Sequence, residues 1–144
     1  MYTLFLLPDR LAIVRLEANA MLPEWAITPC EAVQCNLLAL VRTADELSIV
    51  CNVLSLPADI ADEAHPRVDR GWRALKVQGP LDFSLVGVLA TLTAPLAQAR
   101  VTVFAISTYD TDYILIKETN LYTAMMALRQ AGHEVHLDLA ETEG

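Results

Sequence analysis

The sequence has few basic residues, few glycines and few prolines, and each shortage argues against a class of protein. Its 144 residues include 10 Lys and Arg against 18 Asp and Glu, which gives a formal charge of −8. Nucleic-acid binding draws much of its affinity from Lys and Arg that displace counterions, so we expect no nucleic-acid partner. With 5 glycines, 7 prolines and 54% apolar residues, the chain does not have the composition of a disordered protein. We expect one ordinary globular domain or two very small ones.

Long hydrophobic runs and a cysteine framework are also missing. No stretch approaches the ~20 apolar residues that a membrane helix needs. The apolar start at 1–7 lacks the basic residues of a secretory signal and is interrupted at Pro8. The three cysteines, Cys30, Cys35 and Cys51, are odd in number and fit no zinc spacing. These features predict a cytoplasmic protein with reduced thiols and no membrane partner.

The second half of the sequence alternates clearly between strand and helix patterns. Period-two alternation predicts strands at 71–79, 101–107, 112–117 and 134–139. A first helix is expected to be capped by Asp82. Its buried stripe consists of Leu85, Leu89, Leu92 and Leu96. A second helix should follow a cap at Thr119 or Asn120 and end at Gly132. The resulting order, βαββαβ, is that of a ferredoxin-like unit.

The first half of the sequence is a weaker copy of the second. It predicts strands at 11–16, 36–42 and 47–51, with only short helical segments at 21–28 and 57–63. The stretch Thr43–Val50 shares Thr, Asp and Ile positions with Thr108–Leu115, which indicates a duplication. We therefore predict an α+β protein of two tandem ferredoxin-like units, with antiparallel sheets and helices on one face. The expected boundaries are 1–64 for a degenerate first unit and 65–144 for a complete second unit.

The start of the first predicted helix is a candidate for anion binding. The first N–H groups of a helix lack partners within the helix and can hold a carboxylate, and here they belong to Ser84, Leu85, Val86, Gly87 and Val88. A glycine inside a helix costs up to ~1 kcal/mol relative to alanine. Either a ligand approaches the backbone at Gly87, or a neighbouring element packs closely there.

The turn between the two middle strands carries the complementary charge. It contains Thr108, Tyr109, Asp110 and Asp112, and a carboxylate at the start of a strand could receive an ammonium group. The alternative is an ordinary solvated turn stabilised by side chain–backbone bonds. The aspartates lack the further oxygen ligands and the glycine of a calcium loop, so we expect no metal. The pair His133-x-x-His136 points to opposite faces of a strand, which also argues against a shared metal.

The chain resembles the ACT-domain family. The motifs that carry the resemblance are Gly71-Trp72-Arg73, Gly79–Phe83, Gly87-Val88-Leu89 and Ser107–Tyr113. More narrowly, the chain is similar to tandem-ACT proteins related to CASTOR-type arginine sensors and to the regulatory domains of aspartate kinase. Those sensors have acidic residues before the helix glycine where this sequence has Ser84, Leu85 and Val86, so the resemblance does not extend to arginine as the ligand.

The resemblance implies two ACT-like units and a small ligand, usually an amino acid, bound at an interface between units. It implies that Gly87 and Val88 offer backbone groups to the ligand carboxylate and that Thr108 and Asp112 line its amine or side-chain end. Since the chain has one complete unit, a full site would need a homodimer.

Two classes of function remain from the sequence. The first is a non-catalytic regulatory module that binds a small molecule and acts on a protein partner in trans. The second is a ligand-free interaction protein that assembles through its sheet edges. No nucleophile, metal cluster or phosphate loop is visible, so we expect neither an enzyme nor a cofactor.

Overall fold

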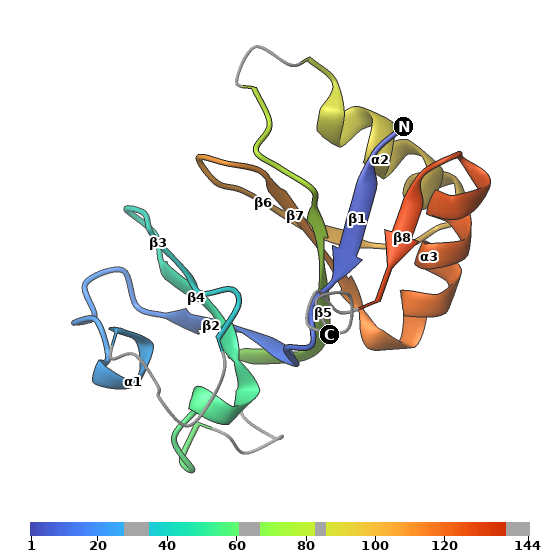
Figure 1. Ribbon diagram of the computed structural model, residues 1–144. Helices are drawn as coiled ribbons and strands as arrows, with labels where there is room; N and C mark the ends of the chain where they lie inside the picture. Colours follow the sequence, from blue (N-terminus) through green and yellow to red (C-terminus); the bar gives the residue numbers. More distant parts are fainter. Residues whose placement is uncertain (28–34, 61–66, 83–85, 138–144) are drawn as a thin grey trace. The chain divides into compact units, whose positions relative to one another are not determined.

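The computed structural model describes residues 1–27, 35–60, 67–82 and 86–137 (Figure 1). The chain divides into two compact units. The N-terminal unit is Asp9–Gly71, and the C-terminal unit combines Met1–Pro8 with Trp72–Gly144. Within the described residues, no helix has the length and apolar character needed to cross a membrane.

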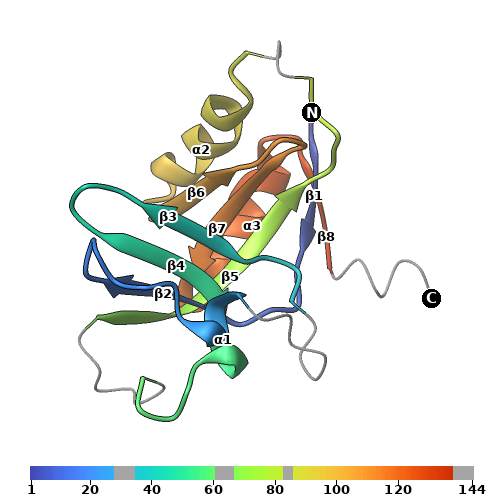
Figure 2. The same ribbon diagram turned by 90° about the vertical axis from the view of Figure 1, so that its left-hand side faces the viewer.

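The C-terminal unit is a ferredoxin-like layer of strands with two helices on one face (Figures 1 and 2). Its strands follow the order β6-β7-β5-β1-β8 across the sheet. The bounds are β1 (Thr3–Leu6), β5 (Val68–Val77), α2 (Val88–Gln98), β6 (Val103–Ser107), β7 (Asp112–Lys117), η2 (Glu118–Asn120), α3 (Leu121–Gln130) and β8 (Glu134–His136). The predicted βαββαβ order is confirmed, since β5, α2, β6, β7, α3 and β8 follow one another along the chain.

Strand β1 is an addition that the sequence analysis did not predict. It lies between β5 and β8, antiparallel to the former and parallel to the latter. Leu4 and Leu6 are buried in the core that the sheet shares with α2 and α3. The expected boundary at 64/65 placed residues 1–8 in the first unit, whereas the structure places Met1–Pro8 in the same unit as Trp72–Gly144. The strand has only four residues, and its partners lie some seventy or more positions further along the chain. No local sequence pattern predicts such a pairing.

Helix α2 begins later than predicted. Its buried stripe consists of Val88, Leu92 and Leu96, so the expected spacing is correct for the two later leucines. The expected cap at Asp82 is wrong, because Gly87 is the N-cap, with φ 81°. This left-handed conformation is disfavoured for residues that carry a Cβ. Gly87 therefore lies at the entrance of the helix, where the backbone requires glycine, and not in its interior.

The N-terminal unit has the same strand order with reduced helices. Its elements are β2 (Leu11–Leu16), α1 (Glu24–Ile27), β3 (Ala39–Arg42), β4 (Leu47–Asn52), η1 (Val53–Ser55) and the start of β5. The sheet order is β3-β4-β2-β5, and a separate small core includes Val14, Ala26 and Ile49. Helix α1 has four residues. The predicted short helix at 57–63 extends into residues 61–66, which lie outside the described residues. The prediction of a degenerate first unit is confirmed.

The sequence repeat corresponds to two hairpin turns with the same hydrogen bonds. The N–H and Oγ1 of Thr43 donate to the carbonyl of Glu46 at 2.8 and 3.3 Å. The N–H and Oγ1 of Thr108 donate to the carbonyl of Thr111 at 2.8 and 3.0 Å. A shared side chain–backbone bond explains why threonine recurs at this position.

Candidate functional site

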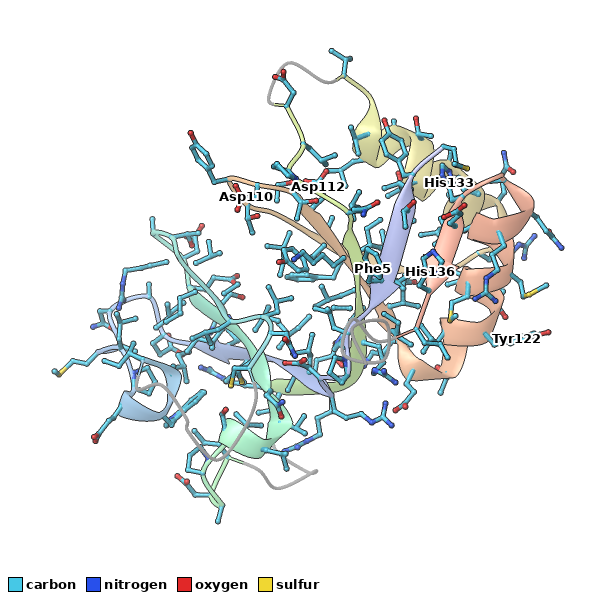
Figure 3. All side chains as sticks on the ribbon, in the orientation of Figure 1. Phe5, Asp110, Asp112, Tyr122, His133 and His136 are labelled. Carbon is cyan, nitrogen blue, oxygen red and sulfur yellow. The ribbon has the colours of Figure 1, made fainter. Side chains whose placement is uncertain are left out.

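A cavity of about 340 Å³ opens where the start of α2 faces the β6–β7 turn. It is lined by three segments of the C-terminal unit, at 81–82, 87–90 and 107–112. Figure 3 shows Asp110 and Asp112 on the turn side of this region. The cavity therefore joins the two segments that the sequence analysis singled out separately.

Most of the predicted site residues line this cavity. They are Gly87, Val88, Thr108, Tyr109, Asp110 and Asp112. Val86 is not among the lining residues and is 93% exposed, while Ser84 and Leu85 lie outside the described residues. The sequence analysis missed the other lining residues, which are Leu81, Asp82, Leu89, Ala90, Ser107 and Thr111. Binding of a ligand by any of these residues stays a prediction.

The α2 side of the cavity presents the positive end of a helix dipole. The first bond of the helix runs from the N–H of Thr91 to the carbonyl of Gly87, at 2.9 Å. The N–H groups of Val88, Leu89 and Ala90 precede it and have no acceptor within the helix. Gly87 has no side chain to cap them, and N–H groups at the start of a helix favour an anion.

The hairpin side of the cavity presents a carboxylate held in place. Ser107 and Asp112 are opposite each other where β6 and β7 meet the turn. The Ser107 hydroxyl donates to Oδ1 of Asp112 at 2.6 Å. This bond fixes the half-buried Asp112 side chain and leaves its charge at the edge of the cavity.

Thr111 attaches the turn to the end of β5. Its hydroxyl donates to the carbonyl of Val77 at 2.6 Å in a buried position. The N–H of Leu81 donates to the carbonyl of Asp110 at 2.7 Å. A Cβ at Gly79 would lie 3.1 Å from both the Asp110 carbonyl oxygen and Cβ of Thr111, so a side chain there would require the two segments to move apart by a few tenths of an ångström. These bonds use backbone atoms, which leave little residue-type signal in a sequence.

The charged side chains that line the cavity are all acidic. Asp82, Asp110 and Asp112 contribute carboxylates, and the described lining includes no Lys, Arg or His. Burial, and then the Asp110 carboxylate, raise the pKa of Tyr113, which keeps that phenol neutral. Within the described part of the chain, no three His, Cys, Asp or Glu side chains form a group that could hold a metal ion. The arrangement suits a ligand with one anionic and one cationic end.

The corresponding region of the N-terminal unit is bridged by a side chain. Arg42 and Ser107 both end the first strand of their hairpins, opposite Leu47 and Asp112 respectively. The Arg42 guanidinium donates to the carbonyls of Ala18 and Ala20, the latter at 2.6 Å. It thereby ties the hairpin to the loop before α1. The small Ser107 forms no such bridge among the described contacts, and the C-terminal unit keeps a cavity at this place.

Comparison with known proteins identifies the family. A model of the ACT domain matches residues 67–130, and a second model, described as an N-terminal domain, matches residues 9–59. A crystal structure of a protein from Agobacterium tumefaciens is 33% identical, with a TM-score of 0.80, and the match covers 95% of this chain and 93% of that one.

Two more distant structures share the fold. The ligand-free regulatory subunit of aspartate kinase from Thermus thermophilus is 12% identical, with a TM-score of 0.57 and coverage of 86% of this chain and 93% of that one. A Vibrio cholerae protein, described as of unknown function and possibly a transport protein, is 17% identical, with a TM-score of 0.63 and coverage of 90% and 89%. The ACT-domain model covers β5 to α3, and the C-terminal unit has the βαββαβ order. The match to the Agobacterium protein extends over nearly the whole of both chains. This chain belongs to the ACT-domain family.

Proposed function

We propose that this protein is a non-catalytic regulatory module that binds an amino acid in the cavity of its C-terminal unit and acts on a protein partner in trans. The observation that carries the proposal is the position of the helix N-terminus and the fixed carboxylate of Asp112 in the lining of one cavity. The aspartate kinase regulatory subunit with this fold is a precedent for a regulatory chain separate from its catalytic partner.

The two ends of the cavity match the two charges of an amino acid. The ligand carboxylate would accept hydrogen bonds from the first N–H groups of α2, at Val88, Leu89 and Ala90. Its ammonium group would donate to Asp112, beside the hydroxyl of Thr108. The volume of about 340 Å³ lies at the lower end of the ~300–1,000 Å³ range of small-molecule sites, which favours a small ligand.

A thermal-shift screen of the twenty amino acids tests this function. A ligand at 100 times its dissociation constant should stabilise the folded protein by ~2.7 kcal/mol, and we expect at least one amino acid to raise the melting temperature. Nucleic acid or lipid vesicles, added in place of the amino acid, should leave the melting temperature unchanged. If all twenty leave the melting temperature unchanged at millimolar concentration, the alternative of a ligand-free interaction protein that assembles through its sheet edges replaces the sensor.

We also propose that the protein works as a homodimer or a higher even assembly. The chain has one complete ACT unit beside a degenerate one, and ligand sites of this family lie at interfaces between units. Light scattering at micromolar concentration should therefore give twice the chain mass of 15.8 kDa or an even multiple of it. A strict monomer, with and without the responding amino acid, would contradict the proposal.

A cytoplasmic location fits the chemistry of the described cysteines. Cys35 and Cys51 are free thiols, the first exposed and the second buried. Burial, and then the nearby Cys35, raise the pKa of Cys51 to about 11, so that thiol stays protonated and unreactive. A reducing compartment keeps such thiols reduced.

A further inference from the structure

His133, directly before β8, and His136, at its end, lie against two aromatic residues at the start of the chain, Tyr2 directly before β1 and Phe5 within it. The Tyr2 and His133 rings stack with centroids 5.8 Å apart, and the Phe5 and His136 rings stack at 5.5 Å. Figure 3 shows Phe5 and His136 next to each other on these neighbouring strands. His133 differs from His136 in burial, since His133 is 6% exposed and the side chain of His136 is 46% exposed.

The His133 ring holds β1 by accepting a backbone hydrogen bond. The N–H of Tyr2 donates to Nδ1 of His133 at 3.1 Å. The strands are also joined through the N–H of Glu134, which donates to the carbonyl of Tyr2 at 2.9 Å. The N–H and the carbonyl of Tyr2 are thus both bonded, the first to His133 and the second to Glu134.

The bond from Tyr2 also sets the tautomer of the ring. Because Nδ1 accepts from Tyr2, the neutral ring is assigned its hydrogen on Nε2. The backbone of Thr91 in α2 also acts on the ring and favours its protonated form.

We infer that His133 is a pH-sensitive latch at the start of the N-terminal strand: the neutral ring holds Tyr2, and protonation of the ring loosens the attachment of β1 at this end. A protonated imidazole carries hydrogen on both nitrogens. It cannot accept the bond from Tyr2, whose N–H would then face the N–H of Nδ1. The start of the strand would lose one of its two backbone bonds at Tyr2 and keep the one from Glu134.

The surroundings of the ring favour its neutral form. Burial, and then the positive amino terminus, lower the pKa of His133 from its ordinary value of 6.5, against the opposing Thr91 bond. The Glu134 carboxylate interacts with other groups: it accepts a hydrogen bond from Oγ1 of Thr3 at 3.5 Å and lies 3.3 Å from Nε2 of His136. The Arg129 guanidinium of α3 bonds to the carbonyl of Val135 at 2.8 Å. The phenol ring of Tyr2 stacks on the imidazole and is a further titratable group against it among the described residues.

The sign of the pH dependence follows from the lowered pKa. Between the pKa of the folded state and the ordinary value of 6.5, the unfolded chain binds more protons at this position than the folded one. The stability of the β1 attachment is therefore complete above pH 6.5 and declines as the pH falls below it.

Hydrogen exchange of the intact chain at pH 7.5 and pH 5.5 tests the latch. After correction for intrinsic exchange rates, the protection of the amides in 2–6 should fall by roughly two- to tenfold more than that of β6 and β7, as expected for the loss of one hydrogen bond. In His133→Asn, whose amide cannot be protonated in this range, this excess loss should disappear. In His136→Asn, the matched control three residues further along the chain, the excess loss should persist.

Two results would overturn the latch. One is an excess loss of protection in His133→Asn equal to that of the wild type. The other comes from a nuclear magnetic resonance titration of the wild-type ring, which needs no variant to fold: a pKa of His133 at or above 6.5, or an Nδ1–H tautomer, would exclude the mechanism. A pKa below 6.5 with the Nε2–H tautomer supports it.

Discussion

Deletion of residues 1–7 is expected to unfold the C-terminal unit, although most of that unit lies more than sixty residues further along the chain. Leu4 is 0% and Leu6 is 7% exposed in its core. Truncation of one such leucine to alanine costs ~2–5 kcal/mol. The deletion removes both leucines and also the backbone hydrogen bonds of β1 to β5 and to β8. The combined loss is comparable with the ~5–15 kcal/mol that stabilises a whole domain.

Tryptophan fluorescence can follow this unfolding in one unit. The Trp25→Phe variant leaves Trp72 as the remaining tryptophan of two. Trp72 is buried next to Phe104, with ring centroids 6.2 Å apart, and reports on the C-terminal unit. The truncated chain should show no cooperative melt of Trp72, and a peptide of residues 1–8 added in excess should restore it. A truncated chain that melts like the full one would show that β1 is dispensable.

The Asp112→Asn variant is expected to lose affinity for the amino acid that the screen identifies. The change removes one charge but keeps the shape of the side chain and an oxygen that can accept from Ser107. A charge-assisted hydrogen bond contributes ~1.5–3 kcal/mol, so the dissociation constant should rise by about 10- to 150-fold. The unliganded melting temperature should remain close to that of the wild type, because the half-buried Asp112 keeps its structural partner.

A matched control separates binding from the general effect of charge. Asp59→Asn removes the same charge from an exposed position of the N-terminal unit and should leave the affinity unchanged in a calorimetric titration. If Asp112→Asn binds as tightly as this control, the ammonium group of the ligand lies elsewhere. If it melts at a lower temperature without any ligand and binds normally, Asp112 is a turn residue only.

The sequence was sufficient for the elements from β5 to β8, because their types and order follow from local patterns along the chain. Leu92 and Leu96 on one helix face and Gly132 after the next helix, with φ 97°, are local signals, and they were interpreted correctly. Strand β1 was missed because its register with β5 and β8 depends on residues far away in the sequence. A short apolar run offers no periodicity that distinguishes a strand from any other buried segment.

The site was partly predictable for the same reason. Asp112 and Thr108 stand out as polar residues in a hairpin, and Gly87 as an unusual glycine before an apolar helix. The interpretation of Gly87 as an interior helix residue was wrong, because Gly87 is the N-cap with a left-handed φ of 81°. Glycine permits this backbone conformation, but the residue type alone does not predict it. The attachment of the turn through Thr111 and the carbonyl of Val77 is visible only once β5 and the hairpin are placed side by side.

Strand β5 belongs to both units, and this has an evolutionary consequence. Its first residues close the N-terminal sheet, and from Trp72 onward it is a central strand of the C-terminal sheet. The division falls at Gly71, with φ 80°. No single cut in the gene yields two self-sufficient halves, because a cut at this glycine would separate the second half from β1. The N-terminal unit is one continuous segment between β1 and the rest of the C-terminal unit, so recombination could exchange it only with two cuts, one on each side of it.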